Sequence, residues 1–239
     1  GLNAVGCCGD ETLDCNGVCG GSAEVDACGI CGGPGFNSAG CCGGEENTSC
    51  DFVSVWRTEG PSESITLPLR QRFSSEQGFN YDFEVDWGDG SAPSTVTSFD
   101  DPDRVHTYAA AGDYTVRISG SLPTLYFNNE GDKDKLIAIP NLGSVGWTSF
   151  AHAFQGCSNL GRVAGGDTSS VTDMRGMFSQ ATSANPDVSG WDTSSVSNMR
   201  GMFEGATSAN PDTSGWDTSS VTSMAYMFYE ATSANPDTS

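Results

Sequence analysis

Residues 167–191 read DTSSVTDMRGMFSQATSANPDVSGW, and nearly the same stretch returns from Asp192 and again from Asp217. The sequence therefore repeats with a 25-residue period, and the third copy is incomplete at Ser239. A unit this short cannot bury its own apolar side chains, so successive copies are expected to stack on one another. Residues 167–239 are thus predicted to form a repeat array.

The apolar residues of each copy follow the spacing +3, +3, +1, +3, which favours one face of a short helix. In the first copy these residues are Val171, Met174, Met177, Phe178 and Ala181. Ser170, Ser195 and Ser220 precede the apolar sets as candidate N-caps, and Asp173 completes a capping box in the first copy. A short strand is expected around residues 188–192. We therefore predict an α/β leucine-rich-repeat-type solenoid with Met, Phe and Trp rows inside.

Residues 129–166 are expected to form a divergent first repeat that caps the array. Phe150, Phe154 and Cys157 align with Met174, Phe178 and Ala181, at an offset one position shorter than the repeat. This alignment predicts that Cys157 occupies a small buried core position rather than a disulfide. His152 lies between two core positions and is expected to be exposed on the helix.

The repeats resemble the BspA-like surface-protein family, also seen in mycoplasma lipoproteins, whose repeats carry W-D-T-S-S-V-T-x-M-x-x-M-F. The resemblance covers the part of the chain from 129 to 239. It implies surface exposure and adhesion or matrix contact, without an active site. The chain departs from the family at Ala184, Ala209 and Ala234, where the family usually has Phe before Asn. The loss of this aromatic row is expected to thin the core.

Polar rows run along the repeats at the same period. Asn185, Asn210 and Asn235 are expected to stack into a ladder, as are two rows of aspartates: Asp187, Asp212 and Asp237, and Asp167, Asp192 and Asp217. Carboxylates stacked roughly 5 Å apart repel one another. Either each aspartate is held by backbone N–H groups of its own loop, or a cation such as Ca²⁺ bridges the row.

Residues 51–128 show the alternation of a half-buried antiparallel sheet. From Phe79 to Trp87 every second residue is apolar, and Gly88-Asp89-Gly90 follows as a turn. Similar alternation appears at 53–55, 65–69 and 114–118. We expect a small β-sandwich of immunoglobulin-like texture.

The strings FEVDWGDGS and HTYAAAGDYTVRISG resemble the polycystic-kidney-disease (PKD) domain. The resemblance implies a β-sandwich that acts extracellularly as a spacer or adhesion module, and it does not imply catalysis. Asp86 and Asp89 are either calcium ligands or, as we favour, a solvated residue and a turn residue. His106 is expected to be a packing residue.

Residues 1–50 are predicted to form an irregular disulfide-rich module, which implies an oxidising, extracellular compartment. The candidates are Cys7, Cys8, Cys15, Cys19, Cys28, Cys31, Cys41, Cys42 and Cys50. Their number is odd, so we expect one partner outside the chain. Zinc at Cys15, Cys19, Cys28 and Cys31 is a less favoured alternative, because acidic neighbours raise thiol pKa values. The module resembles Gly/Cys modules of secreted microbial and algal proteins, and Asn47 opens a glycosylation sequon.

The composition excludes several classes of partner. The chain of 239 residues carries 31 acidic and 10 basic residues, for a net charge of −21. Such a charge disfavours nucleic acid and anionic membrane surfaces, and no apolar run long enough to span a membrane is visible. No nucleophile elbow, phosphate loop or zinc-protease motif occurs, so we expect a protein without enzymatic activity and without any certain cofactor besides possible calcium.

Three hypotheses for function follow. The first is a secreted or cell-surface protein that acts in adhesion, with extracellular proteins or glycans as ligands. The second is a structural subunit of a filament or surface layer, assembled by repeat stacking and disulfides, with other copies of itself or neighbouring repeats of a longer chain as partners. The third is a non-catalytic region of a larger secreted hydrolase.

Overall fold

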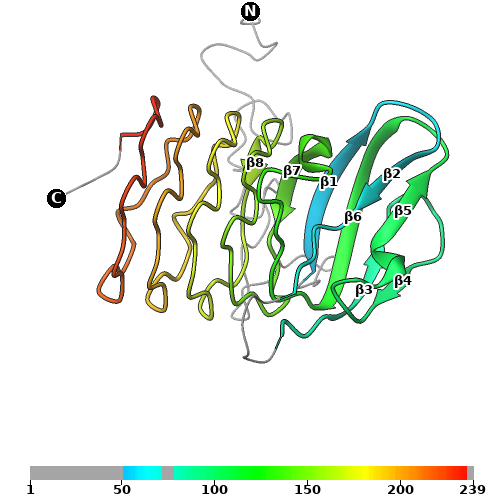
Figure 1. The fold of residues 1–239 in the computed structure, drawn as a ribbon, viewed down its shortest axis with the longest axis horizontal. Helices are drawn as coiled ribbons and strands as arrows, with labels where there is room; N and C mark the ends of the chain where they lie inside the picture. Colours follow the sequence, from blue (N-terminus) through cyan, green and yellow to red (C-terminus); the bar gives the residue numbers. More distant parts are fainter. Residues whose placement is uncertain (1–50, 72–77, 236–239) are drawn as a thin grey trace, which may run out of the picture.

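The computed structural model describes residues 51–71 and 78–235, which form two β-sheets followed by a stack of coils (Figure 1). The nine N-terminal cysteines, Asn47 and Asp237 lie outside these residues, so the predictions on them stay predictions. The strands are β1 (Phe52–Thr58), β2 (Glu63–Thr66), β3 (Asp82–Asp86), β4 (Ser94–Val96), β5 (Val105–Tyr108), β6 (Gly112–Ser121), β7 (Leu136–Asn141) and β8 (Arg162–Val163). Two 3-10 turns, η1 (Pro102–Arg104) and η2 (Lys133–Lys135), complete the regular elements.

The larger sheet has six strands in the order β4-β3-β6-β1-β7-β8, and β2 pairs with β5 in a separate two-stranded sheet. Strand β1 pairs antiparallel with β6 from Phe52 opposite Ile118 to Thr58 opposite Gly112. The predicted alternation around β3 is confirmed, because Phe83 and Val85 are buried while Asp82, Glu84 and Asp86 are exposed. The β-rich fold class is therefore confirmed, and the assignment to the PKD type stays a prediction.

Strand β7 joins the sheet region to the repeats. It pairs antiparallel with β1 on one side and parallel with β8 on the other. The parallel pairing continues into the next coil, where the N–H of Asp187 donates to the carbonyl of Val163 at 2.9 Å. The six-stranded sheet thus includes strands from both sides of the predicted boundary at residue 128.

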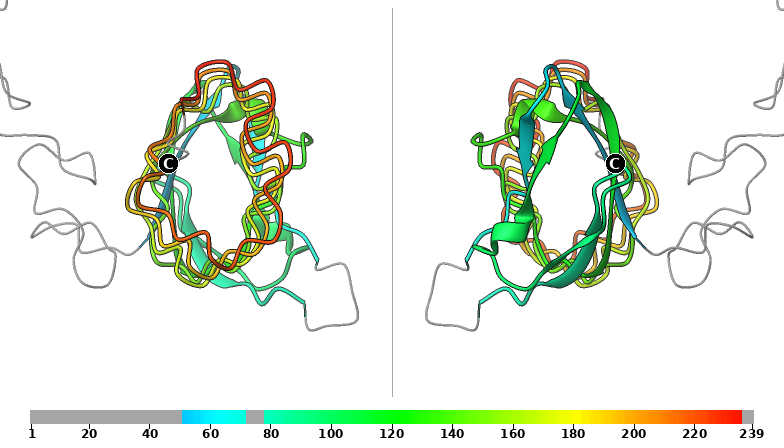
Figure 2. Two further views of the ribbon diagram at one scale, coloured as in Figure 1. Left: turned by 90° about the vertical axis from the view of Figure 1, so that its left-hand side faces the viewer. Right: turned by 90° about the vertical axis from the view of Figure 1, so that its right-hand side faces the viewer.

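From residue 148 onward the chain winds in coils that lie nearly on top of one another when viewed along the stack (Figure 2). Parallel bridges link Ser149 to Asp173, Asp173 to Asn198 and Asn198 to Ser223. Between residues 174 and 180 every second N–H donates to a carbonyl of the next coil, as from Gly176 to Arg200 at 2.9 Å and from Phe178 to Met202 at 2.8 Å. The repeat period is therefore the length of one coil.

The predicted α/β architecture of the repeats is wrong, because residues 51–71 and 78–235 contain no α-helix. No strand forms at 188–192 either, and each copy is a run of turns such as that closed by the N–H of Met177 and the carbonyl of Met174. Two positions per coil have a left-handed backbone, as at Gly176 (φ 58°) and Gln180 (φ 61°), which a helix does not allow. The helix-like spacing instead places the apolar residues of consecutive turns on the inner side of the coil. The backbone N–H groups donate to neighbouring coils, so no helix is needed to satisfy them.

The interior of the stack is a ladder of aromatic rings. Phe154, Phe178, Phe203 and Phe228 stack in turn, with ring centroids 5.6, 5.6 and 5.4 Å apart. Cys157 is buried and free, as predicted. Ala184 and Ala209 are fully buried in the same core.

The prediction for His152 is wrong. This residue is half-buried rather than exposed on a helix, and its backbone is left-handed with φ 56°. Its position in the coil matches that of Gly176, because both N–H groups donate to the next coil.

A polar groove beside the stack of coils

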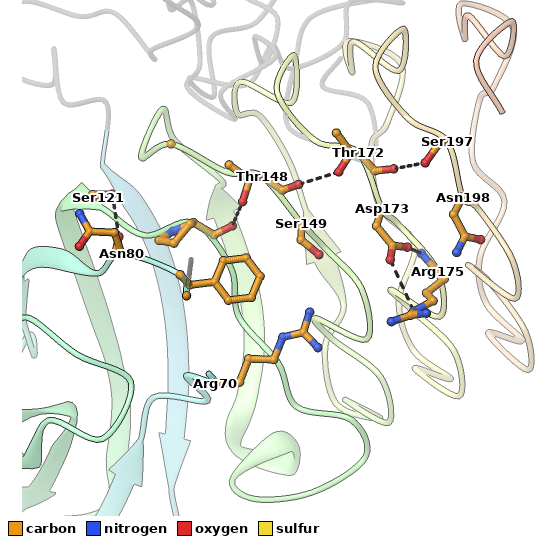
Figure 3. Close-up of a pocket in the computed structure, with 14 residues that line it drawn as sticks. Arg70, Asn80, Ser121, Thr148, Ser149, Thr172, Asp173, Arg175, Ser197 and Asn198 are labelled. Atoms are coloured by element: carbon orange, nitrogen blue, oxygen red, sulfur yellow. Dashed lines mark hydrogen bonds and ion pairs between the residues drawn. The ribbon is translucent and has the colours of Figure 1, made fainter. Parts of the chain in front are cut away.

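A groove of about 700 Å³ lies where the first coils meet the sheet region (Figure 3). It is lined from the sheet side by Arg70, Gly78, Phe79, Asn80, Ser121 and Pro123, and from the coils by Gly146, Thr148, Ser149, Thr172, Asp173, Arg175, Ser197 and Asn198. The coil residues recur at the repeat period, so the groove runs along the stack.

One wall of the groove is a row of hydroxyl groups. The Oγ1 of Thr148 donates to the carbonyl of Pro123 at 3.3 Å, that of Thr172 to Thr148 at 3.4 Å, and the Oγ of Ser197 to Thr172 at 3.1 Å. Each hydroxyl hydrogen is thus directed at the preceding coil, and the oxygen keeps lone pairs that can accept from a ligand. The backbone N–H of Thr172 and that of Ser197 also donate to the preceding coil.

Two arginines bring positive charge to the groove. Their guanidinium groups point toward one another in Figure 3; burial lowers the pKa of Arg70, and the positive charge of Arg175 lowers it further. Arg70 lies over the ring of Tyr126, 4.1 Å from its centroid, and 5.4 Å from that of Phe79. Arg175 pairs with Asp173 at 3.5 Å and keeps 47% of its side chain exposed. Arg70 is therefore held in place, whereas Arg175 faces solvent.

His152 lies close to these arginines without adding charge at neutral pH. Burial lowers its pKa, and the two arginines lower it further against the opposing hydrogen bond with Gln155. The Nδ1 of His152 is 2.7 Å from the Oε1 of Gln155, and its ring meets Tyr126 edge to face with centroids 5.9 Å apart. His152 thus packs against the tyrosine ring over which Arg70 lies.

The aspartates of the repeats are held by their own loops, which is the first of the two predicted arrangements. The Oδ1 of Asp167 accepts from the N–H of Ser169 at 3.0 Å, and Asp192 accepts likewise from Ser194. Asp187, Asp212 and Asp217 accept from Ser189, Ser214 and Ser219. Hydrogen bonds from the serine side chains are the main cause of the lowered pKa values of Asp192 and Asp217. These contacts stabilise the carboxylates.

In the sheet region, Asp89 joins a turn to a strand. Its Oδ1 accepts from the N–H of Ser91 at 3.0 Å, and its Oδ2 lies 2.7 Å from the Nε2 of His106 in β5. The ring of His106 stacks on Trp87 with centroids 5.0 Å apart. The exposed Asp86 accepts from the N–H of Gly88 at 2.9 Å. In this geometry Asp89 stabilises a turn and His106 is a packing residue.

Across residues 51–71 and 78–235 no group of three or more His, Cys, Asp or Glu side chains is placed to hold a metal ion. Calcium at the predicted aspartates therefore has no support from this part of the chain and stays a prediction.

The asparagine row forms a ladder between side chain and backbone. The Oδ1 of Asn185 accepts from the N–H of Asn210 at 2.9 Å, and the Oδ1 of Asn210 accepts from the N–H of Asn235 at 2.9 Å. The ladder stabilises successive coils outside the aromatic core.

The groove itself was missed by the sequence analysis. Its coil side is visible in the repeat as the aligned Thr172 and Ser197 and the aligned Arg175 and Arg200. Its sheet side has no such signal, because Arg70, Phe79 and Asn80 reach the groove only through the tertiary fold.

The fold and the groove define a β-rich protein in which a stack of repeat coils extends a sheet. Residues 148–239 match the model of a family described as "Mycoplasma protein of unknown function, DUF285". This match agrees with the mycoplasma-type part of the predicted resemblance and with a surface protein; the PKD assignment stays a prediction, and the leucine-rich α/β form is not supported. No curated protein and no solved structure matches the chain.

Within the described part of the chain, no helix has both the length and the apolar character that crossing a bilayer requires.

Proposed function

We propose that the protein is a non-enzymatic, extracellular surface protein that adheres to cells or matrix through the groove beside its coils. The observation that carries this proposal is the groove itself, which combines hydroxyl groups, amides and two guanidinium groups on a closely hydrogen-bonded framework. Rigid scaffolds of this kind lose little conformational entropy on binding.

Adhesion of beads that carry the full chain to matrix proteins and immobilised glycans tests the proposal. Ser197 is exposed in the groove wall, so Ser197→Trp is expected to obstruct the groove and reduce adhesion at least tenfold. Ser208→Trp is the matched control, because Ser208 is exposed in the same stack but does not line the groove. Equal adhesion by both variants, or no adhesion by the unmodified chain, contradicts the proposal.

A second candidate function, a structural subunit that assembles by stacking, is favoured by the last described coil. Met224, Tyr226 and Tyr229 are 41%, 57% and 53% exposed there. The N–H groups of Met224, Tyr226 and Phe228, whose counterparts donate to a following coil, find no backbone acceptor among the described residues. A coil surface of this kind can pair with a further coil, whether of the same chain or of another copy.

Sedimentation of the full chain over a range of concentrations tests this second candidate. Assembly is expected to grow with concentration and to weaken in Met224→Lys, which adds a charge to the exposed end. Arg162→Lys, a substitution at an exposed residue of β8, is the control. A monomer at every concentration contradicts assembly.

A further inference from the structure

The charge of the groove is opposite to that of the chain. Its lining holds Arg70 and Arg175 against a single carboxylate, that of Asp173, whereas the whole chain has a net charge of −21. The net positive charge of the lining attracts negative charge, so a ligand drawn to this groove is anionic.

A third arginine extends the positive charge along the stack. Arg200 occupies the position of Arg175 in the following coil, since the bridge between Asp173 and Asn198 sets the two coils in register. Neighbouring hydrogen-bonded strands lie roughly 4.8 Å apart. Arg200 is exposed, and its guanidinium carbon lies 5.5 Å from the centroid of the Tyr226 ring. Arginines at matching positions of successive coils suit an extended ligand that carries negative charges along its length.

The uncharged part of the lining suits hydroxyl groups on the ligand. The oxygens of Thr148, Thr172 and Ser197 can accept hydrogen bonds, because their own hydrogens are directed at the preceding coil. An extended peptide is disfavoured, because the backbone N–H groups of Thr172 and Ser197 already donate between coils and leave no free strand edge for pairing.

We propose that this groove binds an acidic glycan whose carboxylates pair with Arg70 and Arg175, and whose hydroxyl groups donate to the Thr148, Thr172 and Ser197 row. A longer glycan follows the stack, and its next carboxylate reaches Arg200. The proposal rests on the proposed adhesive function and names the class of ligand. The carboxylate pairs hold the glycan by charge-assisted hydrogen bonds, for which the planar guanidinium group is well suited.

Binding of fluorescent oligogalacturonate to the full chain, measured by anisotropy, tests this proposal. The methyl ester of the same oligosaccharide is the matched ligand, because it keeps the hydroxyl groups and removes the charge. The acid is expected to bind at least tenfold more tightly than the ester, and to bind less tightly as the salt concentration rises.

Arginine variants locate the site. Arg175→Ala is expected to weaken binding of the acid about tenfold, and the substitution is compatible with the fold because the third copy has Ala225 at this position. Arg200→Ala is expected to weaken binding of long oligomers more than that of short ones. Arg162→Ala removes the same charge from an exposed residue of β8, outside the groove lining, and is expected to leave binding unchanged.

Three results overturn the inference: equal binding of acid and ester, equal weakening by Arg175→Ala and Arg162→Ala, or tighter binding of poly-glutamate than of oligogalacturonate. The adhesion test decides the proposed function independently of the glycan-binding test. If beads adhere to other surfaces in a way that Ser197→Trp abolishes, but oligogalacturonate does not bind, adhesion stands and the acidic glycan is excluded.

Discussion

The sheet region and the stack of coils bury similar side chains by different means. In the sheet region, strands distant in sequence pair antiparallel, as β1 with β6, and alternate residues point into the core. In the coils, each residue meets its counterpart one repeat away, and turns replace strands. The comparison shows that a regular repeat can form a β-like ladder with almost no strand, because the neighbouring coil supplies the hydrogen-bond acceptors.

The largest expected effect comes from the aromatic ladder. Phe203 is fully buried between Phe178 and Phe228, so Phe203→Ala is expected to lower the free energy of unfolding by about 3–5 kcal/mol in urea titrations. Hydrogen exchange is expected to accelerate in the neighbouring coils before β3 and β6, since coils contact mainly their neighbours. Phe228→Ala, at the partly exposed end, is the control and should lose clearly less. Equal losses would contradict the ladder as described.

Two glycine substitutions, one in each region, are expected to differ in the stability they cost. Gly88 in the sheet region has φ 76°, and a Cβ there would collide with the carbonyl of Thr115, so Gly88→Ala is expected to destabilise by about 3 kcal/mol. Gly205 in the coils has φ 68° and only ordinary contacts around an added Cβ, so Gly205→Ala is expected to lose about 1 kcal/mol. Thermal unfolding measures the stability of both variants. A larger loss of stability in Gly205→Ala than in Gly88→Ala would contradict this expectation.

The carboxylates of Asp89 and Asp192 differ in how distant their hydrogen-bond partners are along the chain. Hydrogen bonds from Ser91, with a contribution from His106, lower the pKa of Asp89 to about 2. A lowered pKa contributes stability above the unfolded value near 4 that is lost as the pH falls toward 2. Asp89→Asn is therefore expected to lose about 1 kcal/mol at pH 6, and the difference should shrink between pH 4 and pH 2.

The coil aspartates provide the comparison for Asp89. The carboxylate of Asp192 accepts hydrogen bonds from Ser194 in its own loop, so Asp192→Asn is expected to change the unfolding free energy by less than about 0.5 kcal/mol at any pH. Urea titrations across this pH range measure both variants. If Asp89→Asn lowered the free energy of unfolding by the same amount at every pH, the charge of Asp89 would not be the source of its stabilisation.

The last substitution is expected to increase stability. Gln180 has a left-handed backbone with φ 61°, and the same position in the next coil is Gly205. Gln180→Gly is expected to raise the free energy of unfolding by about 0.5–1 kcal/mol, because glycine adopts this backbone without steric strain. Gln180→Ala keeps the strain and is the control, so an equal gain in both variants would argue against backbone relief. Calorimetry can resolve the difference.

Much of the molecule could be predicted from the sequence. The alternation around Phe83 and Val85 placed a half-buried strand, and the alignment of Cys157 with Ala181 placed a buried thiol. Both predictions hold because burial follows directly from local periodicity. The prediction of helices is wrong, because Gly176 and Gln180 have a left-handed backbone. The +3, +1, +3 spacing directs apolar side chains inward from a series of turns as well as from a helix.

The sequence by itself determined the length of a coil, the identity of the rows that stack, and the acidic character of the chain. A short and constant period leaves little freedom in which side chains face one another. Only the tertiary structure decided that β7 turns an antiparallel sheet into a parallel stack, and that Arg70 meets Arg175 across a groove. These features depend on contacts between segments far apart in the chain, and no local pattern carries that information.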